Sequence, residues 1–130
     1  MSRFPQTVEF THLNRPLGIE WTARNLHVEG KIPDEIQGAF FRAVPDPAFP
    51  PLFDDDSTLS ADGMVSRFWF ENGAVDHDIR YLRTPRFEAE RKARRALFGR
   101  YRNPYSDLPE VRNVDRAAAN TTPVWHAGRL

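Results

Sequence analysis

The segment 62–85 (DGMVSRFWFENGAVDHDIRYLRTP) constrains the fold more than any other part of the chain, because it predicts a β-hairpin together with its register. Asn72-Gly73 favours a two-residue type I′ turn, in which both central residues need a positive φ angle. That turn places Arg67 opposite Asp78, which is a favourable cross-strand charge pair. Because strand side chains alternate between two faces, one face is predicted to be largely apolar. Its members are Met64, Phe68, Phe70, Val75, His77, Ile79 and Tyr81.

A two-stranded hairpin alone is marginally stable in water, so we expect a larger β-structure to cover this apolar face. Further strands are predicted at residues 21–29 and 39–44, a single helical turn at 34–38 and a loop at 45–60. Phe40 and Phe41 point to opposite faces of their strand, which predicts that both sides of it are buried.

One short α-helix is predicted near residues 85–98. Thr84 suits the N-cap position and Pro85 the first turn, and Gly99 is expected to end the helix. Residues 122–130 resemble a strand and a turn whose returning strand is cut short. Because an unpaired sheet edge leaves backbone groups without partners, we expect the chain to be the front part of a longer β-rich protein and incomplete as it stands.

The composition indicates one soluble domain over residues 1–130, with residues 1–18 as an extended arm. The 130 residues carry 18 basic and 18 acidic side chains, so the net charge of zero gives no case for binding nucleic acid. The absence of cysteine excludes disulfides. Without a signal-type segment or a membrane span, a cytoplasmic location is expected.

No group of neighbouring residues in the sequence has the spacing of a catalytic or metal site. The four histidines are too scattered to share one face of a strand or helix: His12, His27, His77 and His126. His77 is either a structural histidine or a ligand, and its place on the apolar hairpin face favours the structural role. The acidic run 54–56 is interpreted as a solvated loop rather than a calcium site, because the EF-hand spacing is missing. The basic run 90–95 is either an anion-binding patch or a water-facing helix surface.

The motifs, taken in order, resemble the N-terminal part of the carotenoid cleavage oxygenase family. They are Gly30-Lys31-Ile32-Pro33 followed by Ile36-Gln37-Gly38, Arg42 and Pro45, then Asp62-Gly63-Met64-Val65, Tyr81-Leu82-Arg83-Thr84 and Asn120-Thr121-Thr122. Residues 90–104 are most similar to the bacterial lignostilbene dioxygenase branch of that family, which cleaves stilbenes rather than carotenoids.

This resemblance implies a mainly β fold, of which the chain forms the N-terminal part of a seven-bladed β-propeller. It also implies a dioxygenase that uses non-haem Fe(II) and O₂ to split the central C=C bond of a 4-hydroxystilbene, or of a related phenylpropanoid or apocarotenoid, into aldehydes. In the family four histidines of later blades hold the iron, and none of the histidines here matches them. The iron ligands are therefore expected outside this chain, and the chain alone is expected to be inactive.

The resemblance assigns a substrate-binding role to two residues and a catalytic role to none. Tyr101 matches the tyrosine that binds the 4-hydroxyl group of the substrate, and a phenol can both donate and accept a hydrogen bond. A loop tyrosine packed against the helix end is the alternative. Leu59 stands where the branch has a phenylalanine, which removes an aromatic surface from the pocket. The lysine that partners the tyrosine would follow Leu130. The alternative function is a non-catalytic, truncated or degenerate β-rich binding or structural protein.

Overall fold

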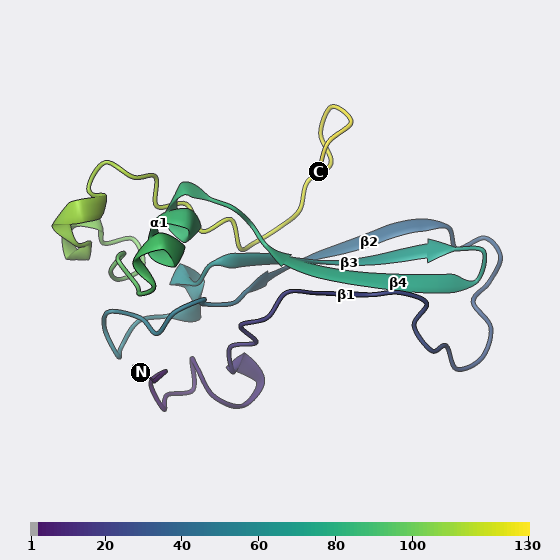
Figure 1. Cartoon of the computed structure of the whole chain (residues 1–130), viewed down its shortest axis with the longest axis horizontal. Coiled ribbons are helices and arrows are strands. Elements are labelled where there is room, and N and C mark those ends of the chain that lie inside the picture. The colour runs from purple at the N-terminus through teal and green to yellow at the C-terminus, as the bar shows by residue number, and fades with distance from the viewer. Residues whose placement is uncertain (1–2) are drawn as a thin grey trace.

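The computed structural model describes residues 3–130 as a mainly β chain with one α-helix, built around a four-stranded antiparallel sheet (Figure 1). The strand order is β1-β4-β3-β2, so the predicted hairpin forms the centre of the sheet. The strands are β1 (Trp21–Ala23), β2 (Gly38–Pro45), β3 (Gly63–Glu71) and β4 (Ala74–Tyr81). The helix α1 (Pro85–Ala93) follows β4. Short 3-10 helices lie before β1, between β2 and β3, and after α1: η1 (His12–Asn14), η2 (Thr58–Ser60), η3 (Pro104–Ser106) and η4 (Pro109–Val111).

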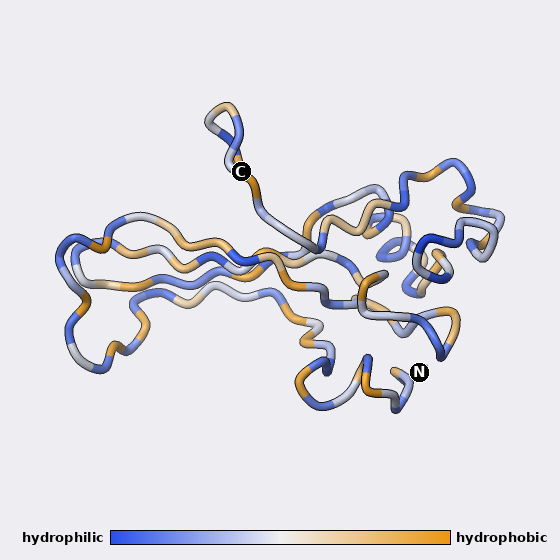
Figure 2. The backbone as a smooth tube through the Cα atoms, turned by 180° about the vertical axis from the view of Figure 1, so that it is seen from behind, coloured by the Kyte–Doolittle hydropathy of each residue, from blue (hydrophilic) through white to orange (hydrophobic). Residues whose placement is uncertain are grey.

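The hairpin β3–β4 has the predicted register. Asn72 and Gly73 have φ angles of 50° and 78°, as a type I′ turn requires. Arg67 lies opposite Asp78, and their side chains form an ion pair with an N–O distance of 2.5 Å. Apolar and polar residues alternate along these strands (Figure 2), as expected for a sheet with two different faces. The turn type, the register and the charge pair are confirmed.

Asp78 lies among polar side chains on one face of the sheet. The Thr22 hydroxyl and the Arg67 guanidinium donate hydrogen bonds to its carboxylate at 2.7 and 2.5 Å, and Arg24 does so at 3.3 Å. These hydrogen bonds favour the ionised carboxylate and lower the pKa of Asp78 to about 2. Asp78 thereby connects the edge strand β1 to the central hairpin.

The lowered pKa predicts an acid-sensitive sheet. A carboxyl group whose pKa is lower in the folded state stabilises the fold above its unfolded pKa of about 4, and that stabilisation is lost as the pH falls toward the folded value. We expect Asp78→Asn to destabilise the protein at neutral pH and to flatten its loss of stability between about pH 4 and pH 2. Thermal unfolding across this range measures both effects. Asp34→Asn, which removes an exposed ion pair with Lys31, is the matched control. An unchanged acid profile in Asp78→Asn would contradict this role.

The main hydrophobic core lies where the sheet meets α1. Met64, Ile79 and Tyr81 pack against Phe87, and the rings of Tyr81 and Phe87 stack with their centroids 4.8 Å apart. The Tyr81 hydroxyl donates a hydrogen bond to Asp46 at 2.5 Å, and burial raises the pKa of Tyr81. The apolar hairpin face is therefore buried at the end of the sheet that approaches the helix.

Three predictions for the region before the hairpin need correction. The strand expected at residues 21–29 ends at Ala23, because Asn25 adopts a left-handed conformation with φ 51°. Residues 34–38 form a turn that leads into β2 rather than a helical turn. The strand expected at 39–44 is present, but Phe40 is 57% exposed, so its two faces are not both buried within this chain.

The helix begins as predicted and ends earlier than predicted. The Thr84 hydroxyl accepts a hydrogen bond from Phe87 N at 3.1 Å, which confirms the N-cap. The expected extent near 85–98 is wrong, because Arg94 takes the left-handed conformation, with φ 56°, and the helix stops at Ala93. Beyond this point the chain turns back, so that Leu97 and Phe98 are buried in a second small core with Val111.

The two ends of the described chain are less regular than expected. Residues 3–18 contain a turn and η1, and Phe10 is buried, so the arm is not extended throughout; Met1 and Ser2 lie outside the described residues. Near the C-terminus the turn at Ala127-Gly128 forms, but only His126 and Arg129 pair across it. Among residues 3–130 we find no helix with the length and apolar character needed to cross a membrane.

Candidate functional site

A pocket of about 270 Å³ lies between η2, the start of α1 and the loops that follow the helix. Leu59 and Tyr101, the two substrate-binding residues predicted from the sequence, both line it. Their exposed fractions are 55% and 42%, so both side chains are accessible. The remaining polar and charged residues of the lining include Arg86, Arg102, Arg116 and Asn120.

Asp56 connects the segment that carries Leu59 to the segment that carries Tyr101. Its Oδ1 atom accepts hydrogen bonds from Ser57 N at 2.8 Å and from Tyr101 N at 3.2 Å. The Asp56 side chain is buried, so the interpretation of residues 54–56 as a solvated loop is wrong for this residue. Its role is to hold two parts of the pocket wall together, since a buried carboxylate needs such donors.

The backbone around Leu59 is fixed from two sides. The Asn120 side-chain amide donates hydrogen bonds to the carbonyl oxygens of Leu59 and Ala61, at 3.1 and 2.8 Å. On the other side, the Glu9 carboxylate accepts hydrogen bonds from the backbone N–H and the hydroxyl of Thr58, which lower the pKa of Glu9. The Leu59 side chain therefore stands on an ordered turn rather than on a loose loop.

Tyr101 presents its ring to the pocket next to a cation. The guanidinium of Arg102 lies 5.2 Å from the ring centroid, within the range of a cation–π contact. The preceding residue, Arg100, binds Asp55 at 2.9 Å and so ties the same loop to the acidic run. With an exposed ring and an anchored backbone, Tyr101 is available for a ligand.

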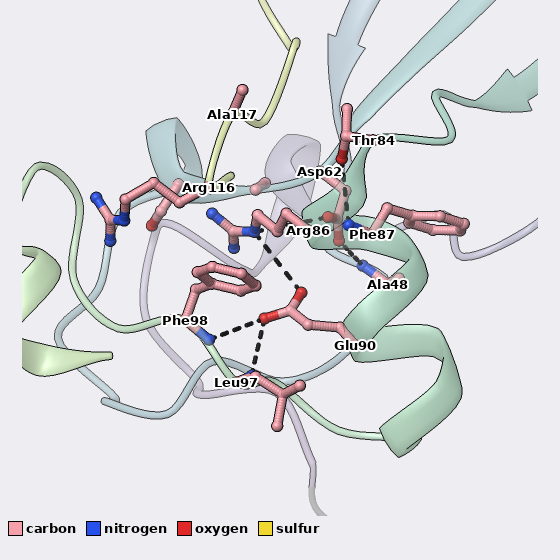
Figure 3. Close-up of polar contacts among 12 residues, drawn as sticks. Ala48, Asp62, Thr84, Arg86, Phe87, Glu90, Leu97, Phe98, Arg116 and Ala117 are labelled. Carbon is pink, nitrogen blue, oxygen red and sulfur yellow. Dashed lines mark hydrogen bonds and ion pairs between the residues drawn. The ribbon is translucent and has the colours of Figure 1, made fainter. Parts of the chain in front are cut away.

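A buried polar cluster lies behind the pocket, and no sequence motif predicts it. Asp62, Arg86 and Glu90 are 3%, 8% and 2% exposed, and Arg86 Nε lies 3.8 Å from Asp62 Oδ1 and 3.7 Å from Glu90 Oε2 (Figure 3). Burial raises the pKa of both carboxyl groups, and the charge of Arg86 partly offsets that effect. The only signal in the sequence is the i, i+4 spacing of Arg86 and Glu90 on the helix.

Glu90 also organises the backbone beyond the helix. Its Oε1 atom accepts hydrogen bonds from Leu97 N at 2.8 Å and from Phe98 N at 3.1 Å, while Oε2 faces Arg86 (Figure 3). One carboxylate therefore satisfies two buried backbone donors and lies next to the charge of one guanidinium. The Phe98 ring that this turn brings back lies 5.3 Å from the Arg86 guanidinium.

The sequence matches the retinal pigment epithelial membrane protein family over residues 14–130. The chain belongs to this family. The resemblance to the carotenoid cleavage oxygenases is thereby confirmed. Among relatives, the chain is 46% identical over its whole length to lignostilbene-alpha,beta-dioxygenase isozyme III of Sphingomonas paucimobilis and 47% identical over 99% of its length to resveratrol cleavage oxygenase 1 of Chaetomium globosum.

Solved structures of this family have the same fold. The lignostilbene dioxygenase of Pseudomonas brassicacearum superposes with a TM-score of 0.81 at 40% identity, over 94% of this chain and 24% of that one. The chain spans about a quarter of the length of the relatives that it matches, covering 26% and 22% of the two named above. The fold described here is thus shared with one part of a longer oxygenase chain.

The histidines can be compared with the family's expected iron site. His77 is held at both ring nitrogens: Trp21 Nε1 donates to Nδ1 at 2.8 Å, and Nε2 lies 2.8 Å from the Ser66 hydroxyl. Since an indole N–H can only donate, Nδ1 is the acceptor in the contact with Trp21. This arrangement, stacked on Phe68, is that of a structural histidine. Residues 3–130 contain no group of three or more metal-ligating side chains, so the described chain does not fit an iron centre by itself.

Proposed function

We propose that the intact enzyme containing this chain is an oxygenase that cleaves the central C=C bond of a 4-hydroxystilbene, or of a related phenylpropanoid, into two aldehydes with O₂. Residues 1–130 would form the first part of its propeller domain. The observation that carries the proposal is that Leu59 and Tyr101, selected from the sequence by resemblance to the stilbene-cleaving branch, line one pocket. The similarity to dioxygenases over the whole chain supports the reaction class.

The proposed reaction needs a centre that activates O₂, and a non-haem Fe(II) would supply that chemistry. Since residues 3–130 hold no suitable group of ligands, the iron would be bound by other parts of the enzyme. The contribution of this chain is to bind and orient the aromatic end of the substrate. Fixing the alkene in one position relative to the oxidising centre is itself a large part of such catalysis.

Each pocket residue has a role that follows from its chemistry. The phenol of Tyr101 would exchange hydrogen bonds with the 4-hydroxyl group of the substrate. Leu59 would contact the ring through aliphatic rather than aromatic surface, which leaves more room than a phenylalanine would and does not favour stacking. Asp56 and Asn120 hold the backbones on which these two side chains stand.

The proposal is tested by giving the intact, iron-loaded enzyme 4-hydroxystilbene in air. We expect consumption of one O₂ per alkene and two aromatic aldehydes, identified by mass spectrometry. A matched incubation with 4-hydroxybibenzyl, which lacks the C=C bond, should give neither product nor oxygen uptake. If the enzyme binds iron and the stilbene but forms no aldehyde, the proposed reaction is wrong.

A further inference from the structure

Arg86 is a charged side chain held rigidly at the back of the pocket that contains Leu59 and Tyr101. It is only 8% exposed, yet it lines that pocket. Three groups fix its position: the Phe98 ring at 5.3 Å and the carboxylates of Asp62 and Glu90 at 3.8 and 3.7 Å. An arginine so constrained presents its donors in one direction, with little conformational freedom left to lose when a ligand binds.

The carboxylates behind Arg86 are themselves held in place. Asp62 Oδ2 accepts a hydrogen bond from Ala48 N at 3.1 Å, and Glu90 Oε1 accepts from two backbone N–H groups of the following turn. Neither carboxylate can therefore swing freely toward the pocket. The position of the guanidinium is determined by the fold rather than by a ligand.

The hydrogen-bonding capacity of Arg86 is largely unused within the described residues. Both carboxylates approach its Nε atom, at distances beyond a hydrogen bond, and this atom has no hydrogen-bond partner in residues 3–130. The terminal amino groups point away from the helix, toward the side of Arg116 and the Ala117 segment (Figure 3). Asp62 Oδ1, which faces Nε, is likewise without a hydrogen-bond partner in residues 3–130, so this unsatisfied pair lies on the buried side of Arg86. The terminal amino groups make no hydrogen bond to these residues and can donate to an acceptor in the pocket.

The charges around Arg86 indicate which acceptor suits it. Two carboxylates lie against Arg86, and Asp107 pairs with Arg116 at 3.0 Å, so the charges of these two pocket arginines are already offset and neither needs an anionic ligand. A neutral oxygen, such as a hydroxyl or ether oxygen on an aromatic ring, can accept from the terminal amino groups without adding a negative charge.

We propose that Arg86 is a further substrate-binding residue, which donates a hydrogen bond to a neutral oxygen substituent on the substrate's aromatic ring. Tyr101 and Arg86 would then contact the same ring from different walls of the pocket. The aromatic nature of the ligand rests on the proposed function, whereas the donor and its orientation rest on the contacts of Arg86 itself.

Binding of uncleavable probes tests this inference without requiring catalysis. Bibenzyl, 4-hydroxybibenzyl and 3-hydroxybibenzyl lack the C=C bond, and their Kd values can be measured on the intact enzyme by calorimetry. We expect Arg86→Met to weaken at least one hydroxylated probe by about tenfold or more while leaving bibenzyl unchanged. The probe that is weakened identifies the ring position that Arg86 contacts. Arg95→Met, which removes an exposed ion pair with Glu110 and lies outside the pocket lining, should change none of the three.

Removing Arg86 leaves two buried carboxylates without their cation, so Arg86→Met alone could fail to fold. The double variant Arg86→Met with Glu90→Gln, compared with Glu90→Gln alone, removes the same donor with one fewer buried charge. The inference is overturned if these two variants bind every hydroxylated probe with equal affinity. It is also overturned if removing Arg86 weakens the binding of bibenzyl as much as that of the hydroxylated probes. Probe binding that depends on Arg86, in an enzyme that cleaves no stilbene, would overturn the proposed reaction and leave the role of Arg86 standing.

Discussion

Replacing Tyr101 with phenylalanine is expected to lower kcat/KM for 4-hydroxystilbene by about tenfold or more. Tyr101 lines the pocket, and the variant loses the hydroxyl group that would hydrogen-bond the substrate. The ring stays in place, since Tyr101 is anchored through its backbone N–H to Asp56 and its ring contacts Arg102. The substitution therefore removes the hydroxyl and leaves the shape of the pocket intact. Steady-state kinetics on the intact enzyme measures the loss.

The neighbouring tyrosine provides a matched control. Tyr105 lies in η3 and is 98% exposed, so Tyr105→Phe removes the same chemical group from a position outside the pocket and should leave kcat/KM unchanged. A second control changes the substrate: for a stilbene without the 4-hydroxyl group, Tyr101→Phe should have little effect. If Tyr101→Phe retains full activity on 4-hydroxystilbene, Tyr101 has no role in recognising that hydroxyl.

The central part of the fold could be predicted because its determinants are local. A two-residue Asn72-Gly73 turn fixes which residues face each other, and every partner of β3 on β4 then follows from counting along the two strands. The start of α1 is equally local, since Thr84 caps the backbone N–H of a residue three positions away.

The end of the helix could not be predicted because contacts between a helix side chain and the backbone beyond the helix accompany it. Residues 94–98 have ordinary helix formers, and Gly99 is the obvious stop signal in the sequence. In the structure the Glu90 carboxylate accepts hydrogen bonds from the backbone N–H groups of Leu97 and Phe98. The chain can therefore leave the helix at Arg94 and bury the side chains of Leu97 and Phe98. Tertiary packing thus overrides local helix propensity.

The candidate site was predicted in part. Leu59 and Tyr101 were found through resemblance to known motifs, but nothing in their spacing says that they meet. The group that brings their segments together is Asp56, which the sequence presents as one of three aspartates in a loop. Arg86 could not be predicted as a buried residue, because a basic residue on a helix usually faces water and only the packed structure shows it buried next to two acidic side chains.

Replacing Glu90 with alanine is expected to be the most destabilising of the substitutions considered, with a loss of about 3–5 kcal/mol. The side chain is 2% exposed, and its oxygens face Arg86 and two backbone N–H groups. Alanine would leave both N–H groups without their acceptor and Arg86 without one of its two neighbouring carboxylates. Thermal unfolding of the intact enzyme measures the global effect. Hydrogen exchange at the amides of Leu97 and Phe98 should report the local effect directly.

Two further variants separate the contributions of Glu90. Glu88→Ala, on the same helix but with a 54% exposed side chain, should cost little, because its nearest cation, Arg83, is 4.0 Å away at the surface. Glu90→Gln keeps an oxygen that can accept from Leu97 and Phe98, but it removes the charge and puts an NH₂ group in place of the oxygen that faces Arg86. We therefore expect strong protection of both amides in Glu90→Gln and weak protection in Glu90→Ala. Equal protection in the two would mean that Glu90 does not hold this turn.

The pH dependence of the protein's stability shows whether the negative charge of Glu90 stabilises or destabilises the fold. Because burial raises the pKa of Glu90, the folded state favours the protonated form, and the stabilisation from this group is fully present below its unfolded pKa of about 4.3. It is lost as the pH rises through the raised folded value. The stability of the natural protein relative to Glu90→Gln, which cannot ionise, should therefore decline as the pH rises from about 4 toward neutrality. A relative stability that instead increases over this range would show that the ion pair with Arg86 outweighs the desolvation of the carboxylate.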